Sequence, residues 1–150
     1  MTLDSLRLHV SSGMVVAARH WRRICHTALT GYGISEACAA PLLMIVRLGD
    51  GVHQVAVAQA AGLESPSLVR LLDQLCKAGL VCRSEDPLDR RAKALSLTAE
   101  GRALAEAIEA ELVRVRHDVL QGIDEADLQA TLRVLRAFEA AGLGTAGGVA

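Results

Sequence analysis

Aromatic residues are nearly absent from this 150-residue chain, in which Trp21, Tyr32 and Phe138 are the only three. A core of Leu, Val, Ile, Ala and Met favours packed helices over an aromatic-rich β-sandwich. The scarcity of rings also argues against an RNA reader that stacks bases on exposed side chains. The chain also has no excess of positive or negative charge, because 16 Lys and Arg nearly balance 17 Asp and Glu and the net charge is -1. Any contact with a polyanion must therefore use a local positive patch.

Other absences narrow the class of protein further. The four cysteines have no C-x-x-C spacing and follow no secretory leader, so we expect reduced thiols in a cytoplasmic protein. No uncharged stretch approaches the roughly 20 residues that span a bilayer, so no membrane segment is expected. Neither a nucleophile elbow nor a phosphate-binding, dinucleotide-binding or paired-acid pattern appears, and the histidines lack metal-ligand spacing. We expect neither catalysis nor a metal or other cofactor.

Helical periodicity dominates both ends of the chain. Apolar residues recur every three or four positions over 3–28, which predicts one long helix. Ser35 is expected to start a second helix that ends at Leu48 and bends at Pro41. Thr98 is expected to cap a long helix over 98–121, and Asp124 to cap a last one. The residues of that last helix expected to point inward are Leu128, Leu132, Leu135 and Phe138.

The middle of the chain predicts two short helices followed by a β-hairpin. The helices are expected over 55–61 and 65–78, with Gly62 in the turn, Ser65 as N-cap and Pro66 at the first helical position. Alternation of apolar and polar residues predicts strands over 80–84 and 93–97, joined by a polar loop. This order of elements is that of a winged helix-turn-helix.

Two groups of residues in this region have the chemistry of a DNA contact. Polar side chains on the outward face of the second short helix can bond phosphates and base edges, although spacing alone fits a solvated helical face equally well. The hairpin carries the one cluster of cations in the chain, and a projecting arginine suits the narrow minor groove. The helix residues are Ser65, Ser67, Arg70 and Gln74, and the hairpin cations are Arg83, Arg90, Arg91 and Lys93.

The run over 68–104, LVRLLDQLCKAGLVCRSEDPLDRRAKALSLTAEGRAL, resembles the signature of MarR-type transcriptional regulators. It has the family's order of recognition helix, GLV-x-R strand, D-x-x-DRR wing and L-T-x-x-G helix start. The resemblance implies a mainly α fold with a small β-hairpin wing. It also implies a winged helix-turn-helix lobe at 34–97, between dimerisation helices at 1–33 and 98–150 that make a single intertwined domain with the lobe.

The resemblance further implies a function for these residues. A homodimer would bind a pseudo-palindromic operator in double-stranded DNA, usually as a repressor. The helix residues would enter the major groove, and Arg90 or Arg91 would reach the minor groove with Asp89 orienting the arginine. An ordinary exposed Asp89–Arg90 ion pair is the plainer reading. The apolar stripes of the terminal helices support a dimer, although an intramolecular bundle could also bury them.

Members of such families respond to small organic ligands, among them aromatic acids. By analogy the effector would bind near an apolar slot with one cation, although these residues could equally be core fillers or solvated side chains. The residues are Met14, His20, Trp21, Met44 and Arg47.

Two alternatives to this function stay open. One is a thiol-based redox regulator of the same fold that senses through Cys25, which follows Arg22 and Arg23 and precedes His26. The other, suggested by the neutral net charge, is a protein-interaction module that does not bind DNA.

Overall fold

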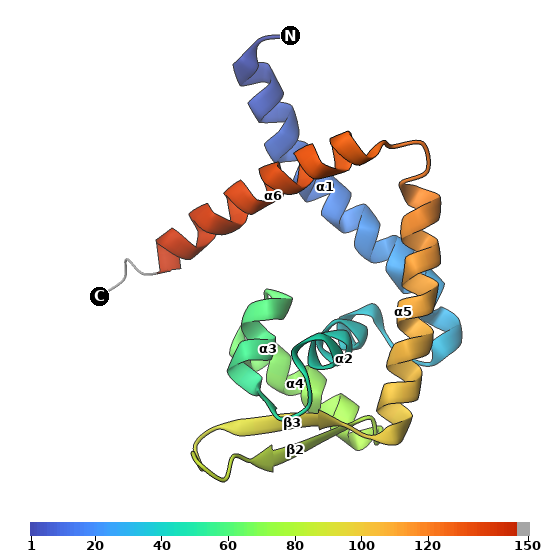
Figure 1. Ribbon diagram of the computed structural model, residues 1–150, viewed down its shortest axis with the longest axis vertical. Coiled ribbons are helices and arrows are strands. Elements are labelled where there is room, and N and C mark those ends of the chain that lie inside the picture. Colours follow the sequence, from blue (N-terminus) through green and yellow to red (C-terminus); the bar gives the residue numbers. More distant parts are fainter. Residues whose placement is uncertain (147–150) are drawn as a thin grey trace. The chain divides into compact units, whose positions relative to one another are not determined.

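The computed structural model describes residues 1–146, and side chains as far as residue 142. Its elements fall into two compact units, Met1–Val115 and Arg116–Ala150. Helices make up most of the chain (Figure 1). The elements are α1 (Leu3–Leu29), η1 (Thr30–Tyr32), α2 (Glu36–Leu48), β1 (Val52–His53), α3 (Gln54–Ala61), α4 (Ser65–Lys77), β2 (Val81–Glu85), β3 (Lys93–Leu97), α5 (Ala99–Val119) and α6 (Glu125–Ala146).

Side-chain caps confirm the predicted helix starts at three places. The Ser35 hydroxyl accepts the Cys38 backbone N–H at 3.2 Å, and Asp124 accepts the Asp127 N–H at 2.8 Å. Thr98 does the same for α5, because its Oγ1 accepts the Gly101 N–H at 2.9 Å. Each bond satisfies one of the backbone donors that a helix leaves free at its first turn. Local chemistry therefore determines where these helices begin.

The start of α4 differs from the prediction by one residue. Glu64 is the N-cap and Ser65 is already helical, so Pro66 stands at the second helical position rather than the first. The Leu68 N–H donates to the Glu64 carbonyl at 3.1 Å, which begins the helix before Ser65. The Ser65 hydroxyl is therefore exposed at the leading end of α4.

A three-stranded antiparallel sheet in the order β1-β3-β2 forms the wing. The β2–β3 hairpin was predicted, and its register pairs Val81 with Leu97 and Glu85 with Lys93. The short strand β1 was not predicted. Val52 pairs with Leu95 and His53 with Ala94, so β1 joins the hairpin to the chain just ahead of α3.

The core of the first unit is aliphatic, as the composition predicts. It joins the C-terminal end of α1 to α2, α3, α4, the sheet and α5. Pro41 lies inside α2 and is buried, and the helix continues past it to Leu48. The mainly helical winged fold is thus confirmed. Its fully buried side chains include Leu29, Leu42, Ile45, Val57, Leu68, Leu72, Leu75, Leu95 and Ile108.

Helix α5 is fixed to the rest of the first unit by close packing and ion pairs. A Cβ on Gly101 would lie 2.8 Å from the Leu80 carbonyl carbon and closer still to its oxygen. Arg102 bonds Asp50 at 2.5 Å, and the other carboxylate oxygen of Asp50 accepts the Leu97 N–H at 3.0 Å. Only glycine at position 101 allows α5 to come this close to Leu80, the residue before β2.

Apolar side chains are exposed on two helices when the chain stands alone. The first half of α1 exposes Leu3, Leu6, Leu8, Val10, Val15 and Val16. Leu132, Leu135 and Phe138 of α6 are exposed and Leu128 is half-buried, so the unit that contains α6 does not itself bury the face predicted to point inward. The unit that contains α6 holds little else, so its apolar face stays uncovered there.

Two other predictions concern the C-terminal segment of the chain and the absence of a membrane-spanning segment. Residues 147–150 of the predicted C-terminal segment lie outside the described residues. Within residues 1–146, no single helix is long and apolar enough to cross a membrane. The one helix pair that reaches this length and composition, Leu3–Tyr32 with Glu36–Leu48, bends by 85°.

Candidate nucleic-acid interface

Helices α3 and α4 form the helix-turn-helix that the sequence predicts. Gly62 adopts the left-handed conformation with φ 64°, and the Leu63 N–H closes the turn on the Ala58 carbonyl at 2.9 Å. Ala58 is buried, so its small side chain permits the close approach of the two helices. The turn therefore fixes α4 against the core on one face and leaves its other face free.

The leading end of α4 presents polar side chains to solvent. Four buried leucines hold its inner face, and Ser65, Ser67 and Arg70 are exposed on the outer one. The N-terminus of a helix attracts anions because its backbone N–H groups and dipole point outward there. This combination of two hydroxyls, one guanidinium and a helix N-terminus suits contact with phosphates and base edges.

Gln74 is exposed on α4 and also makes one contact within the chain. Its Oε1 accepts a hydrogen bond from the Cys38 Sγ of α2 at 3.3 Å, so the amide is held against the neighbouring helix. Its distance along α4 from Ser65 also separates it from the leading end. Gln74 follows Arg70 by four residues and both are exposed, which agrees with the predicted outward position.

The wing loop between β2 and β3 is shaped by two aspartates. Asp86 Oδ1 accepts the Leu88 N–H at 2.8 Å, and Asp89 Oδ1 accepts the Arg91 N–H at 3.0 Å. The contact of Asp89 is thus with the backbone of Arg91, whereas the sequence analysis expected it to orient a guanidinium. Arg90 and Arg91 are both exposed at this loop.

The two cations that flank the loop are paired with carboxylates. Arg83 Nη1 lies 2.9 Å from Asp73 of α4, and its Nε and Nη2 are buried without a hydrogen-bond partner among the described residues. Lys93 Nζ lies 3.5 Å from Glu85 across the hairpin. Arg90 and Arg91 form no ion pair within the described part of the chain, so they are the free positive charges of the wing.

One contact near the wing is not predicted by the sequence. His53 Nε2 lies 2.5 Å from Asp86 Oδ2, which joins β1 to the base of the wing loop. This bond, and then the bond from the Leu88 amide, holds the pKa of Asp86 below its ordinary value. The two residues stand 33 positions apart, and only the unpredicted β1–β3 pairing brings them together.

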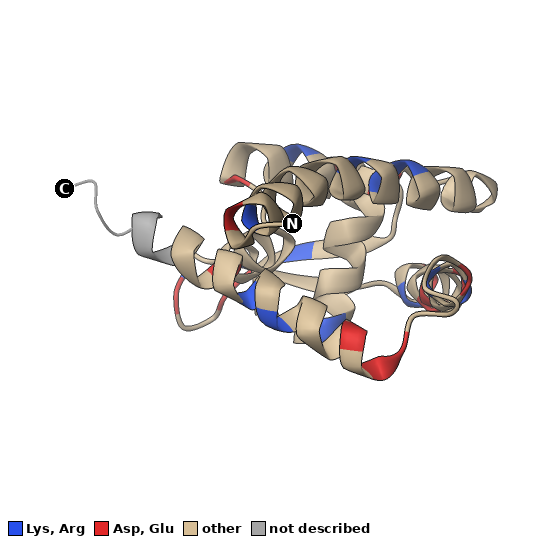
Figure 2. Cartoon of the chain, turned by 90° about the horizontal axis from the view of Figure 1, so that it is seen from above, with Lys and Arg blue, Asp and Glu red and all other residues tan. Residues whose placement is uncertain are grey.

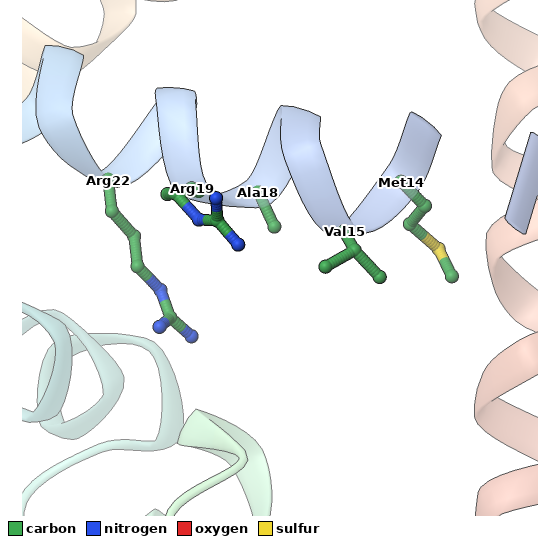
Figure 3. A pocket seen from close by; sticks show the side chains of 5 residues that line it. All are labelled: Met14, Val15, Ala18, Arg19 and Arg22. Atoms are coloured by element: carbon green, nitrogen blue, oxygen red, sulfur yellow. The ribbon is translucent and has the colours of Figure 1, made fainter. Parts of the chain in front are cut away.

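The residues predicted to bind an effector do not gather in one place. Met14 lines a hollow of about 520 Å³ along α1, and its other lining residues are Val15, Ala18, Arg19 and Arg22 (Figure 3). Trp21 and Met44 pack against the core instead, and His20 is exposed. Arg47 lies 3.3 Å from Glu109 of α5. The hollow therefore has two arginines where one cation was expected.

Cys25, the predicted redox residue, is buried within the core cluster. Burial limits the access of an oxidant to the thiol, and sensor cysteines are commonly accessible. Burial also raises the pKa of the Cys76 thiol at the end of α4. Cys82 is exposed on β2.

Basic and acidic residues are interspersed along the chain (Figure 2), and the described residues contain no cluster suited to a metal ion.

Comparison with known proteins places this arrangement among transcriptional regulators. Residues 29–117 match the family model of the ArnR1-like winged-helix domain. The solved transcriptional regulator PA3341 is 38% identical, with a TM-score of 0.76 over 87% of this chain and 98% of that one. A MarR-family regulator from Rhodococcus sp. RHA1 is 26% identical, with a TM-score of 0.73 over 92% and 95%. CouR from Rhodococcus jostii RHA1, bound to p-coumaroyl-CoA, is 28% identical, with a TM-score of 0.72 over 91% of each chain.

Proposed function

This chain belongs to the MarR family of winged-helix transcriptional regulators, and from that premise we propose that it represses transcription as a homodimer bound to a pseudo-palindromic operator. The observation that carries the proposal is the joint presentation of an exposed, polar α4 N-terminus and a wing with two free arginines. Both lie in one compact unit and are fixed to the same core. The protein would act in the cytoplasm on chromosomal DNA.

Each part of the interface has its own role in this proposal. Ser65, Ser67 and Arg70 enter the major groove, where hydroxyls and a guanidinium bond phosphates and guanine edges. Arg90 and Arg91 enter the minor groove, whose negative potential is strongest where it is narrow. Lys93 contacts the phosphate backbone, while Asp89 shapes the loop. Gln74 binds Cys38 of α2 through its amide oxygen, and its amide N–H groups remain available to a base edge. Arg83 of β2 binds Asp73 and so joins the wing to α4.

The dimer would cover the apolar faces that the single chain exposes. The first half of α1 and the described side chains of α6 both present such faces, which a soluble monomer rarely leaves uncovered. A two-fold dimer would place two winged lobes about one helical turn of DNA apart. The segments 1–33 and 98–150 would then supply the dimer contacts and 34–97 the DNA contact.

A small organic anion would release the repressor from DNA. The hollow along α1 combines Met14, Val15 and Ala18 with the guanidinium groups of Arg19 and Arg22. Apolar walls with a few convergent charges are the usual composition of a small-molecule site. CouR, which is similar to this chain, has been solved bound to p-coumaroyl-CoA, an organic ligand with an aromatic acyl group. The ligand acts by binding the DNA-free state more tightly than the DNA-bound state.

The test is a titration of labelled DNA fragments selected by the protein from a random pool. Wild type and the double variant Arg90→Ala, Arg91→Ala are compared by fluorescence anisotropy over a series of salt concentrations. We expect weaker binding by the variant and a smaller slope of log affinity against log salt, by about 0.9 for each phosphate that the variant no longer neutralises. Equal affinity and slope in the two proteins would exclude the wing role. Undetectable or salt-insensitive binding, together with a stable protein complex, would favour the interaction module.

A further inference from the structure

His53 lies where the sheet meets the helix-turn-helix. It ends β1, pairs with Ala94 of β3, and is the residue from which α3 begins. An N-cap side chain commonly bonds the first turn of its helix, but the side chain of His53 makes no such bond. Its Nε2 lies 2.5 Å from Asp86 Oδ2 instead. The imidazole therefore connects the start of α3 to the wing.

Asp86 is the residue that holds the base of the wing loop together. Its Oδ1 accepts the Leu88 N–H at 2.8 Å, and its own backbone N–H donates to the Ala92 carbonyl at 3.2 Å. One carboxylate thus binds the loop with one oxygen and His53 with the other. The position of Arg90 and Arg91 relative to α4 depends on this shared group, because both arginines follow Asp86 within the same loop.

We propose that protonated His53 is a positioning residue that fixes the wing against the helix-turn-helix through Asp86, so that operator affinity falls as pH rises and the imidazole loses its charge. The inference rests on the proposed function. A hydrogen bond between two ionised groups is stronger than one with a neutral donor. Histidine is the side chain whose charge ordinarily changes between about pH 5 and pH 8.

Asp86 is the carboxylate that His53 contacts, and the other charged groups on the neighbouring elements have partners of their own or lie on other strands. Helix α3, which begins beside it, has the sequence QVAVAQAA and carries no titratable side chain. Strand β3 contributes Lys93, which lies 3.5 Å from Glu85 of β2. Asp50, in the turn before β1, is bonded to Arg102. The pKa of Asp86 is held below its ordinary value, so this carboxylate is ionised at neutral pH.

The experiment compares operator affinity at about pH 6 and pH 8 by fluorescence anisotropy at fixed salt. His53→Gln keeps a side-chain N–H donor but has no titratable charge, and Asp86→Asn removes the counter-ion. Wild type should lose up to about fivefold more affinity between the two pH values than either variant. The double variant should bind no more weakly than the single ones. His117→Gln is the matched control, because His117 lies 3.5 Å from Asp118 on α5 and should keep the wild-type pH profile.

Two further measurements separate this inference from the proposed function. In the Arg90→Ala, Arg91→Ala background, His53→Gln should have no additional effect, because the wing then carries no arginines to position. Hydrogen exchange at the Leu88 amide of the free protein should quicken in His53→Gln without any DNA present. If the arginine variant binds as wild type does, the proposed wing role fails. If it binds weakly while His53→Gln keeps the wild-type pH profile and the wild-type Leu88 exchange rate, the positioning role of His53 is overturned.

Discussion

Replacing Gly101 by alanine tests whether α5 is fixed to the winged lobe by close backbone packing. The added Cβ would lie 2.8 Å from the Leu80 carbonyl carbon, where 3.4 Å is the lower end of ordinary van der Waals contact. The obstacle is backbone, so no side chain can turn away. The Leu80 carbonyl also accepts the Thr98 N–H at 3.1 Å, and the Thr98 hydroxyl donates to the Gly79 carbonyl at 2.6 Å.

The expected cost follows from three contributions. Overpacking of a filled site costs about 1–3 kcal/mol, and a weakened hydrogen bond costs about 1 kcal/mol more. The higher helix propensity of alanine stabilises the fold by up to about 1 kcal/mol relative to glycine and offsets part of this cost. We therefore expect Gly101→Ala to lower the free energy of unfolding by about 2 kcal/mol, and Tm by about 4–8 °C for a chain of this length.

The assay is urea unfolding followed by circular dichroism at one fixed protein concentration, since an associating protein gains stability with concentration. Gly13→Ala is the control. Gly13 lies inside α1, and an added Cβ there meets nothing within 4 Å, so helix propensity alone should raise stability by up to about 1 kcal/mol. The reasoning is refuted if Gly101→Ala is as stable as wild type while Gly13→Ala behaves as expected.

Three further outcomes are expected. The pKa of Asp86 is lowered in the folded chain, so its bonds stabilise the fold above the ordinary carboxyl pKa near about 4. This stabilisation is lost as pH falls through the lowered pKa. The urea midpoint of Asp86→Asn should therefore decline less between neutral and acid pH than that of wild type. Leu72→Ala empties a fully buried site on α4 and should cost about 2–5 kcal/mol in the same unfolding assay, whereas an unchanged midpoint would contradict the core assignment. Replacing Arg19 and Arg22 together by alanine should weaken the proposed release of operator DNA by an aromatic acid such as benzoate by about tenfold, without changing affinity in its absence. Equal release by the variant and wild type would remove the hollow from the proposed ligand site.

Most of the helical framework could be predicted because its signals are local. Ser35, Thr98 and Asp124 cap the helices that they were expected to cap, and the glycine turn at Gly62 separates α3 from α4 as predicted. The hairpin followed from two short alternating segments. Each of these signals depends on residues within a few positions of one another, so a single sequence contains all the information that is required.

What the sequence analysis missed depends on contacts between distant segments. Strand β1 has two residues and exists only because β3 pairs with it. The bond between Arg83 of β2 and Asp73 of α4 also joins two different elements. The bond between Gln74 of α4 and Cys38 of α2 does the same across 36 positions. The residue type shows that such a side chain can form a hydrogen bond or ion pair, but only the tertiary structure determines which partner it meets.

The aspartate-bound wing loop has a thermodynamic consequence for association. Fixing the backbone of one residue costs about 1–2 kcal/mol in conformational entropy, and the amides of Leu88 and Arg91 are already bound in the free chain. That entropy is lost during folding and not on encounter with the duplex. In the proposed complex this loop would enter the groove already ordered, and differences in affinity among sequences would then reflect how far the duplex must deform to admit it.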